Sequence, residues 1–143
     1  MQIHQDYDHT RYAIRAYEDR ALTVIAPLDL PPNADPETVR RAQQARLQRL
    51  EEHVVVTPER LITGWMDGDI TDLRAEHLAA LCEVGMEVLI LGTGPRQVFP
   101  HPRHLAPLME RGIGVEVMDT AAACRTYNFL ISDGRRAAAA LLL

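Results

Sequence analysis

The first hydrophobic pattern in the chain has the period of a β-strand. Between residues 13 and 26, five apolar side chains stand at even positions, as expected when one face of a sheet is buried. The polar run at residues 18–20 interrupts this pattern and marks a turn. We therefore predict strand structure over Ala13–Ile25 with a turn in its middle. The residues at the even positions are Ile14, Ala16, Leu22, Val24 and Ala26.

A helical pattern replaces the strand pattern in the segment Leu28–Glu52. Pro31 and Pro32 break the strand, and Asp35 followed by Pro36 is a good N-cap with proline at the first helical position. The sequence predicts a helix from about Pro36 to Glu52. Its apolar stripe is thin, so we expect it to lie on the surface, to be dispensable for folding and to matter for partner choice. The stripe consists of Val39, Ala42, Leu47 and Leu50.

The remainder of the chain is more regular. Apolar runs at residues 54–56 and 61–62 flank Thr57-Pro58-Glu59-Arg60 and predict a hairpin. Because a strand, a helix and a strand in this order form a right-handed crossover, residues 87–91 and 115–118 should be neighbouring parallel strands. Residues 137–143 fit either a helix, by their four alanines, or a short buried strand. The predicted helices are Leu73–Val84, Pro102–Arg111 and Thr120–Ile131.

Composition and charge narrow the possible partners. The 143 residues suit one domain over residues 1–143, and 47% hydrophobic with 24% charged residues is ordinary for a globular protein. A net charge of -5 disfavours nucleic acid as a partner. The polar segment Met1–Arg20 holds no signal-peptide core, and the longest apolar run is too short to span a membrane. Cys82 and Cys124 have no paired spacing, so we expect small core residues in a cytoplasmic protein.

Two strand ends carry the residues that could bind a ligand. Gly92, Thr93 and Gly94 follow a buried strand, where a glycine loop either brings backbone N–H groups to an anion or makes a tight structural turn. Asp119 and Thr120 follow the next predicted strand, where they either cap a helix or line a ligand site. Adjacent parallel strands would place both segments at one sheet edge, around one shallow cleft.

The predicted third helix adds two polar residues to this cleft. Arg125 and Asn128 are three positions apart, so a guanidinium and an amide could meet a carboxylate or phosphate there. Arg125 could equally form a structural ion pair. His101 and His104 have the spacing of neighbouring ligands but lack a third, so we expect surface histidines and no metal. Trp65 is expected to anchor the core. No catalytic motif is visible, and no cofactor is implied.

Four separated blocks in the second half of the chain carry a family resemblance. In order, they are residues 91–94 (LGTG), 112–120 (GIGVEVMDT), 123–128 (ACRTYN) and 134–135 (GR). Together they resemble the domain-of-unknown-function family 498/598, which has the MTH-938-like fold. A fainter likeness reaches back through Trp65 to Tyr12. Two departures from the family pattern stand out. The segment Leu28–Glu52 looks like a helical insertion between two early strands. Ser132-Asp133-Gly134-Arg135 stands where an acidic residue more often precedes the glycine and arginine by one or two places.

The resemblance implies an α/β fold with three layers. These are a central, mixed, mostly parallel sheet of about five strands, helices on one side and a β-hairpin layer on the other. Relatives include a mitochondrial complex I assembly factor and an adipogenesis-associated domain protein, and neither implies an established catalytic activity. The family's motif residues, taken as a shared site, correspond to Gly92, Thr93, Gly94, Asp119, Thr120, Arg125, Thr126, Asn128, Gly134 and Arg135.

Two functional hypotheses follow. The first is a non-enzymatic interaction or assembly-factor-like domain with a protein partner, because the chain has a fold signature without a recognisable nucleophile, base or metal set. The second is a small-anion-binding protein or enzyme that acts at the cleft between the Gly92 loop and the Asp119 helix start. The sequence does not indicate the oligomeric state.

Overall fold

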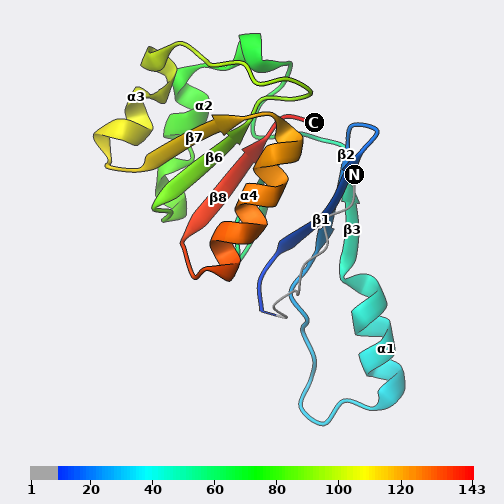
Figure 1. Cartoon of the computed structure of the whole chain (residues 1–143). Helices are drawn as coiled ribbons and strands as arrows, with labels where there is room; N and C mark the ends of the chain where they lie inside the picture. Colours follow the sequence, from blue (N-terminus) through cyan, green and yellow to red (C-terminus); the bar gives the residue numbers. More distant parts are fainter. Residues whose placement is uncertain (1–9) are drawn as a thin grey trace.

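A mixed five-stranded sheet forms the centre of the molecule (Figure 1). The computed structural model describes residues 10–143, so the first nine residues of the polar N-terminal segment lie outside the described residues. The strand order is β5-β4-β8-β6-β7; β8, β6 and β7 are parallel, and β4 is antiparallel to both of its neighbours. The predicted parallel pairing of the strands near residues 87–91 and 115–118 is confirmed. The strands are β4 (Val54–Val56), β5 (Leu61–Thr63), β6 (Val88–Gly92), β7 (Gly114–Met118) and β8 (Ala137–Leu141).

A smaller antiparallel sheet is formed by β1 (Ala13–Glu18), β2 (Ala21–Ile25) and β3 (Leu47–Leu50). Asp19 and Arg20 join β1 to β2 with φ angles of 52° and 59°. Two consecutive residues with positive φ match the twist of a tight hairpin turn. The strand structure predicted on both sides of this turn is therefore confirmed.

The helices are α1 (Pro36–Ala45), α2 (Ala75–Ala79), α3 (Pro102–Glu110) and α4 (Thr120–Ser132). The helix predicted over Leu73–Val84 is wrong in extent, because it is split into α2 and a 3-10 turn at Cys82–Val84. Gly85, in the left-handed region at φ 84°, ends this turn just before β6. α4 has 13 residues. Within residues 10–143, no helix has the length and apolar character needed to cross a bilayer.

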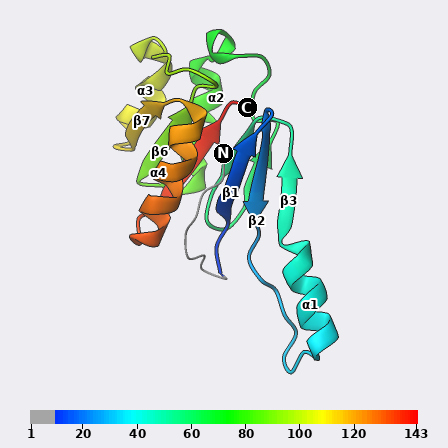
Figure 2. The ribbon, with the colours of Figure 1, turned by 45° about the vertical axis from the view of Figure 1, so that its right-hand side comes forward.

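Alternating side chains of the central sheet face two different layers. Val88, Ile90 and Ala139 pack with α4 and the smaller sheet, whereas Leu89 and Ala138 pack with the helices on the opposite face, α2 and α3. This is the period of two expected for a strand buried on both faces. The predicted three-layer α/β fold is confirmed, with one refinement: α4 shares its face of the sheet with the smaller sheet (Figures 1 and 2).

The alanine-rich segment near the end of the sequence is the central strand, β8. It pairs with β4 on one side and β6 on the other, and all five of its residues are buried. The helix propensity of alanine is a weak preference that tertiary packing overrides. Of the two alternatives for residues 137–143, the structure therefore selects the strand.

The predicted surface helix ends earlier than the sequence indicated. Asp35 caps α1 by accepting a hydrogen bond from the Thr38 N–H at 2.8 Å, as predicted. The expected extension to Glu52 is wrong, because the chain leaves the helix after Ala45 and forms β3 along β2. Pairing with an open strand edge outweighs the helix preference of this arginine- and glutamine-rich segment. α1 itself projects away from both sheets (Figures 1 and 2), and its dispensability for folding stays a prediction.

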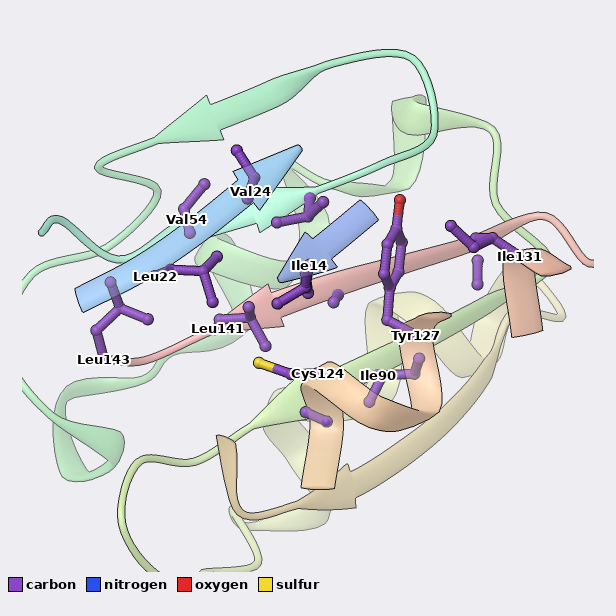
Figure 3. Packing of buried hydrophobic residues seen from close by; sticks show 14 of the residues in the cluster. Ile14, Leu22, Val24, Val54, Ile90, Cys124, Tyr127, Ile131, Leu141 and Leu143 are labelled. Atoms are coloured by element: carbon purple, nitrogen blue, oxygen red, sulfur yellow. The ribbon is translucent and has the colours of Figure 1, made fainter. Parts of the chain in front are cut away.

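Cys124 and Tyr127 extend from α4 into the core between the central and smaller sheets (Figure 3). The Tyr127 hydroxyl donates a hydrogen bond to the Tyr12 carbonyl at 2.9 Å, and burial raises its pKa. Burial also raises the pKa of the Cys124 thiol, from 9.0 to about 12. Cys124 is thus a core residue, as predicted, whereas Cys82 is only half-buried.

The raised thiol pKa predicts a loss of stability in alkaline solution. Above pH 9 the unfolded chain loses the Cys124 proton while the folded chain keeps it, so the folded state becomes relatively less favourable as pH rises. Between pH 8 and 10 this one group should lower the free energy of unfolding by about 1.4 kcal/mol. Urea unfolding of the wild type and of Cys124→Ala measures the effect. The same alkaline loss in both proteins would contradict the prediction.

Candidate functional site

The Gly92 loop and the start of α4 meet at the edge where the parallel strands end. The Gly94 N–H donates a hydrogen bond to Thr120 Oγ1 at 2.8 Å, and the Thr120 N–H donates to the Gly94 carbonyl at 2.9 Å. Thr120 Oγ1 in turn donates to the Leu142 carbonyl at 2.6 Å. One fully buried hydroxyl therefore joins the loop, the helix start and the segment after β8.

Thr93 organises the loop that follows β6. Its N–H donates to the Met118 carbonyl at 2.9 Å, and its hydroxyl donates to the Arg96 carbonyl at 2.5 Å. The same hydroxyl oxygen accepts a hydrogen bond from the Val98 N–H at 3.1 Å. Thr93 is only 4% exposed, and the hydrogen bonds of its hydroxyl hold residues 93–98 in a compact loop.

Gly92 is required by the close approach of its neighbours. A Cβ at this position would lie 2.9 Å from a methyl group of Leu141 and 3.0 Å from Thr120 Oγ1. Both distances are shorter than ordinary van der Waals contact. The absence of a side chain thus lets β6, β8 and α4 meet at this point.

Asp119 and Thr120 occupy the start of α4 in structural roles. Asp119 Oδ1 accepts a hydrogen bond from the Ala122 N–H at 2.9 Å, which confirms the predicted cap. The carboxylate is thereby held by its own helix. Because Gly94 and Ala122 already donate their N–H groups within the protein, these two donors are not available to an anion.

Arg125 and Asn128 lie in different environments on α4. Asn128 is 1% exposed, and its amide makes two hydrogen bonds with the backbone of Ile14 on β1. The Ile14 N–H donates to Oδ1 at 2.9 Å, and Nδ2 donates to the Ile14 carbonyl at 2.7 Å. The Arg125 side chain lies on the exposed side of α4. The sequence-predicted residues therefore divide into a buried group around Thr120, a separate link from Asn128 to β1, and an exposed arginine.

The other candidate residues have simpler environments. His101 and His104 lie with their ring centroids 6.2 Å apart, and His101 Nδ1 accepts a hydrogen bond from the Arg103 N–H at the start of α3. Among residues 10–143, no three His, Cys, Asp or Glu side chains are grouped closely enough to hold a metal ion. Trp65 is half-buried against the core and donates from Nε1 to the Leu141 carbonyl at 3.2 Å.

A cavity of about 450 Å³ lies at the opposite end of the parallel strands, where β6 and β8 begin. Two of the family motif residues, Gly134 and Arg135, line it, together with Arg136 and Arg11. Sequence reasoning missed this site because Arg11 is far from the other residues in the chain. The only local signal was the Gly-Arg-Arg run that follows α4. The motif residues thus occupy both ends of the parallel strands.

This chain matches one protein family and is similar to several solved structures. A family described as "Protein of unknown function (DUF498/DUF598)" matches residues 37–142. NADH dehydrogenase (ubiquinone) 1 alpha subcomplex assembly factor 3 of Danio rerio is 48% identical over 83 residues, which cover 57% of this chain and 48% of that protein. The chain therefore spans about half the length of the curated relatives it matches.

Two solved structures extend the similarity over nearly the whole fold. A protein of Xanthomonas campestris is 35% identical with a TM-score of 0.68, over 99% of this chain and 89% of the other. A Mth938-like domain of Bordetella pertussis is 29% identical with a TM-score of 0.68, over 99% of this chain and 92% of the other. The fold of this chain is thus Mth938-like.

The close packing at Gly92 predicts a position-specific loss of stability. Gly92→Ala should lower the free energy of unfolding by about 1–3 kcal/mol, because the added methyl group overpacks the contact with Leu141 and Thr120. Gly114→Ala on β7 is the matched control, since its Cβ would meet its neighbours at 3.7 Å, and it should change stability by less than about 0.5 kcal/mol. Urea denaturation compares the two; equal effects would refute the packing explanation.

The link between Asn128 and Ile14 predicts a second large effect. Asn128→Ala leaves a buried N–H and a buried carbonyl on β1 without their partners, which should cost about 2–4 kcal/mol. Ser132→Ala removes an exposed hydroxyl from the same helix and should cost less than about 0.5 kcal/mol. Thermal and urea unfolding measure both variants. A cost for Asn128→Ala no larger than that of its control would show that the link does not stabilise the fold.

Proposed function

We propose, from the premise that the chain belongs to the DUF498/DUF598 family, that it is a non-enzymatic interaction domain. In this proposal it binds a protein subunit while a larger complex is assembled. The named relatives support this, because the Danio rerio protein is an assembly factor of NADH dehydrogenase. NADH dehydrogenase is accordingly the first complex in which we would look for the partner of this chain.

The observation that carries the proposal is the exposure of the chain's phenylalanines. The sequence contains only two, and Phe99 is 70% exposed while Phe129 is 66% exposed. Complete burial of such a side chain contributes about 1.5–3 kcal/mol to stability. Neither side chain therefore contributes much to the fold of the isolated chain, and both offer apolar area to a partner.

Two further apolar side chains, one next to Phe99 and one on α3, are also exposed. Val98 precedes Phe99 and is 38% exposed, and Met109 on α3 is 65% exposed. The projecting helix α1 offers a further surface, since none of its residues is buried. These features support our prediction that the segment containing α1 affects partner choice.

The alternative function, anion binding between the Gly92 loop and the Asp119 helix start, stays a prediction. The hydrogen bonds from Gly94 to Thr120 and from Ala122 to Asp119 count against it, because they use N–H groups that an anion would need. Arg125 on α4 and Arg96 in the loop are exposed charged side chains near this end of the strands. The cytoplasmic location also stays a prediction.

The proposed function predicts a defect in assembly without a defect in folding. In cells that encode this chain, its deletion should reduce the amount of assembled NADH dehydrogenase on native gels while the individual subunits are still made. Re-expression of the wild type should restore assembly, and re-expression of Phe99→Ser or Phe129→Ser should restore it less well. Each variant should melt within about 3 °C of the wild type, because these side chains are exposed.

A control variant shows whether the loss of an exposed phenylalanine matters more than the loss of any other exposed side chain. Arg103→Gln alters an exposed side chain of α3 and should restore assembly fully. Unchanged NADH dehydrogenase in the deletion strain would exclude this complex as the target. Full rescue by both phenylalanine variants would exclude these side chains as the partner surface.

A further inference from the structure

The cavity at the amino ends of β6 and β8 is bounded by segments that are distant in the sequence. Met86 precedes β6, Ala137 begins β8, Gly134 follows α4 and Pro58 lies in the turn between β4 and β5. Arg11 closes the cavity from the segment before β1. Its volume of about 450 Å³ falls within the range of small-molecule sites.

The charge of this cavity is opposite to that of the whole chain. Among residues 10–143, the charged residues that line it are Arg11, Arg135, Arg136 and one acid, Glu59. The chain as a whole has a net charge of -5. A concentration of guanidinium groups around a concave surface favours anions, and phosphate and carboxylate match the planar fork of arginine.

Two of these arginines are held in place by the protein itself. Arg11 donates from Nη1 to the Ile131 carbonyl near the end of α4 at 2.6 Å. Arg135 donates from Nε to Glu87 at 2.8 Å, and this hydrogen bond lowers the pKa of the Glu87 carboxyl. Glu87 also accepts a hydrogen bond from the Arg136 N–H at 3.1 Å. The Glu87 carboxylate therefore fixes the backbone and one guanidinium at the cavity wall.

Arg136 differs from the other two. Within residues 10–143, its guanidinium has no salt-bridge partner. The apolar part of the wall, which includes Val84, Met86 and Pro58, would contact an uncharged portion of a ligand. The cavity thus combines an arginine without a salt bridge among residues 10–143, two arginines held by hydrogen bonds, and an apolar surface.

We propose that this cavity binds a small organic molecule that carries a phosphate group or clustered carboxylates. Arg136 provides the accessible charge, Arg11 adds to the positive potential, and Arg135, paired with Glu87, shapes the wall of the cavity. This site lies at the end of the parallel strands opposite the Gly92 loop. The inference does not rest on the proposed assembly function, because it concerns the purified chain alone.

Titration with inorganic pyrophosphate and, separately, with citrate tests the proposal, with sodium chloride keeping the ionic strength constant. In amide NMR spectra, the signals of Gly85 and Gly134 at the cavity should shift in a saturable way. The signal of Gly94 at the opposite end should not shift. Arg136→Gln should weaken the apparent affinity by about tenfold, as expected for loss of one charged hydrogen-bonding group. Arg103→Gln, which removes the same charge from α3, should leave the affinity unchanged.

Three results would overturn the proposal. The first is the absence of saturable shifts with both anions up to about 10 mM, a concentration at which a site with a Kd of about 1 mM would be mostly occupied. The second is a shift of Gly94 in place of Gly85 and Gly134, which would support the cleft at the Asp119 helix start. The third is equal weakening by Arg136→Gln and Arg103→Gln, which would indicate attraction by overall charge alone.

Discussion

The fold depends on the burial of β8 on both faces. This strand of four alanines and a leucine lies between β4 and β6, and it separates two hydrophobic clusters that belong to different layers. The small side chains leave room for larger ones from both directions, such as Tyr127 from α4 and Leu78 from α2. A bulkier central strand would push the layers apart. The close packing of α4 on the central sheet follows from this narrow strand.

Much of this architecture was predictable where hydrophobic period and turn chemistry agree. The hairpin of β1 and β2, the parallel pair β6 and β7, and the Asp119 cap of α4 follow from local patterns. The end of α1 was not predictable in this way. Residues 47–50 have helix-forming side chains, and only the open edge of β2 makes them a strand. The choice between helix and strand for residues 137–141 was likewise decided by pairing partners that local sequence does not specify.

The candidate site shows a related limit. The sequence placed Gly92, Thr93, Gly94 and Thr120 together correctly, because adjacent parallel strands must end at one edge. It did not show that their polar groups bind one another, nor that the Asn128 amide reaches back to Ile14. The motif residues of this chain therefore do not form a single ligand site, although they belong to one sequence pattern. The arginine-lined cavity became visible only when Arg11 and Arg136 were placed in space.

The hydrogen bonds between Ile14 and Asn128 also constrain the order in which the chain acquires its structure. The two residues are 114 positions apart. At a synthesis rate of 5–20 residues per second, Ile14 is added to the chain roughly 6–23 s before Asn128. The β1–β2 hairpin is therefore an early nascent element whose inner face stays uncovered until α4 emerges. The link from β1 to α4 therefore forms late, and until then the apolar inner face of the hairpin is the surface that a chaperone would need to protect.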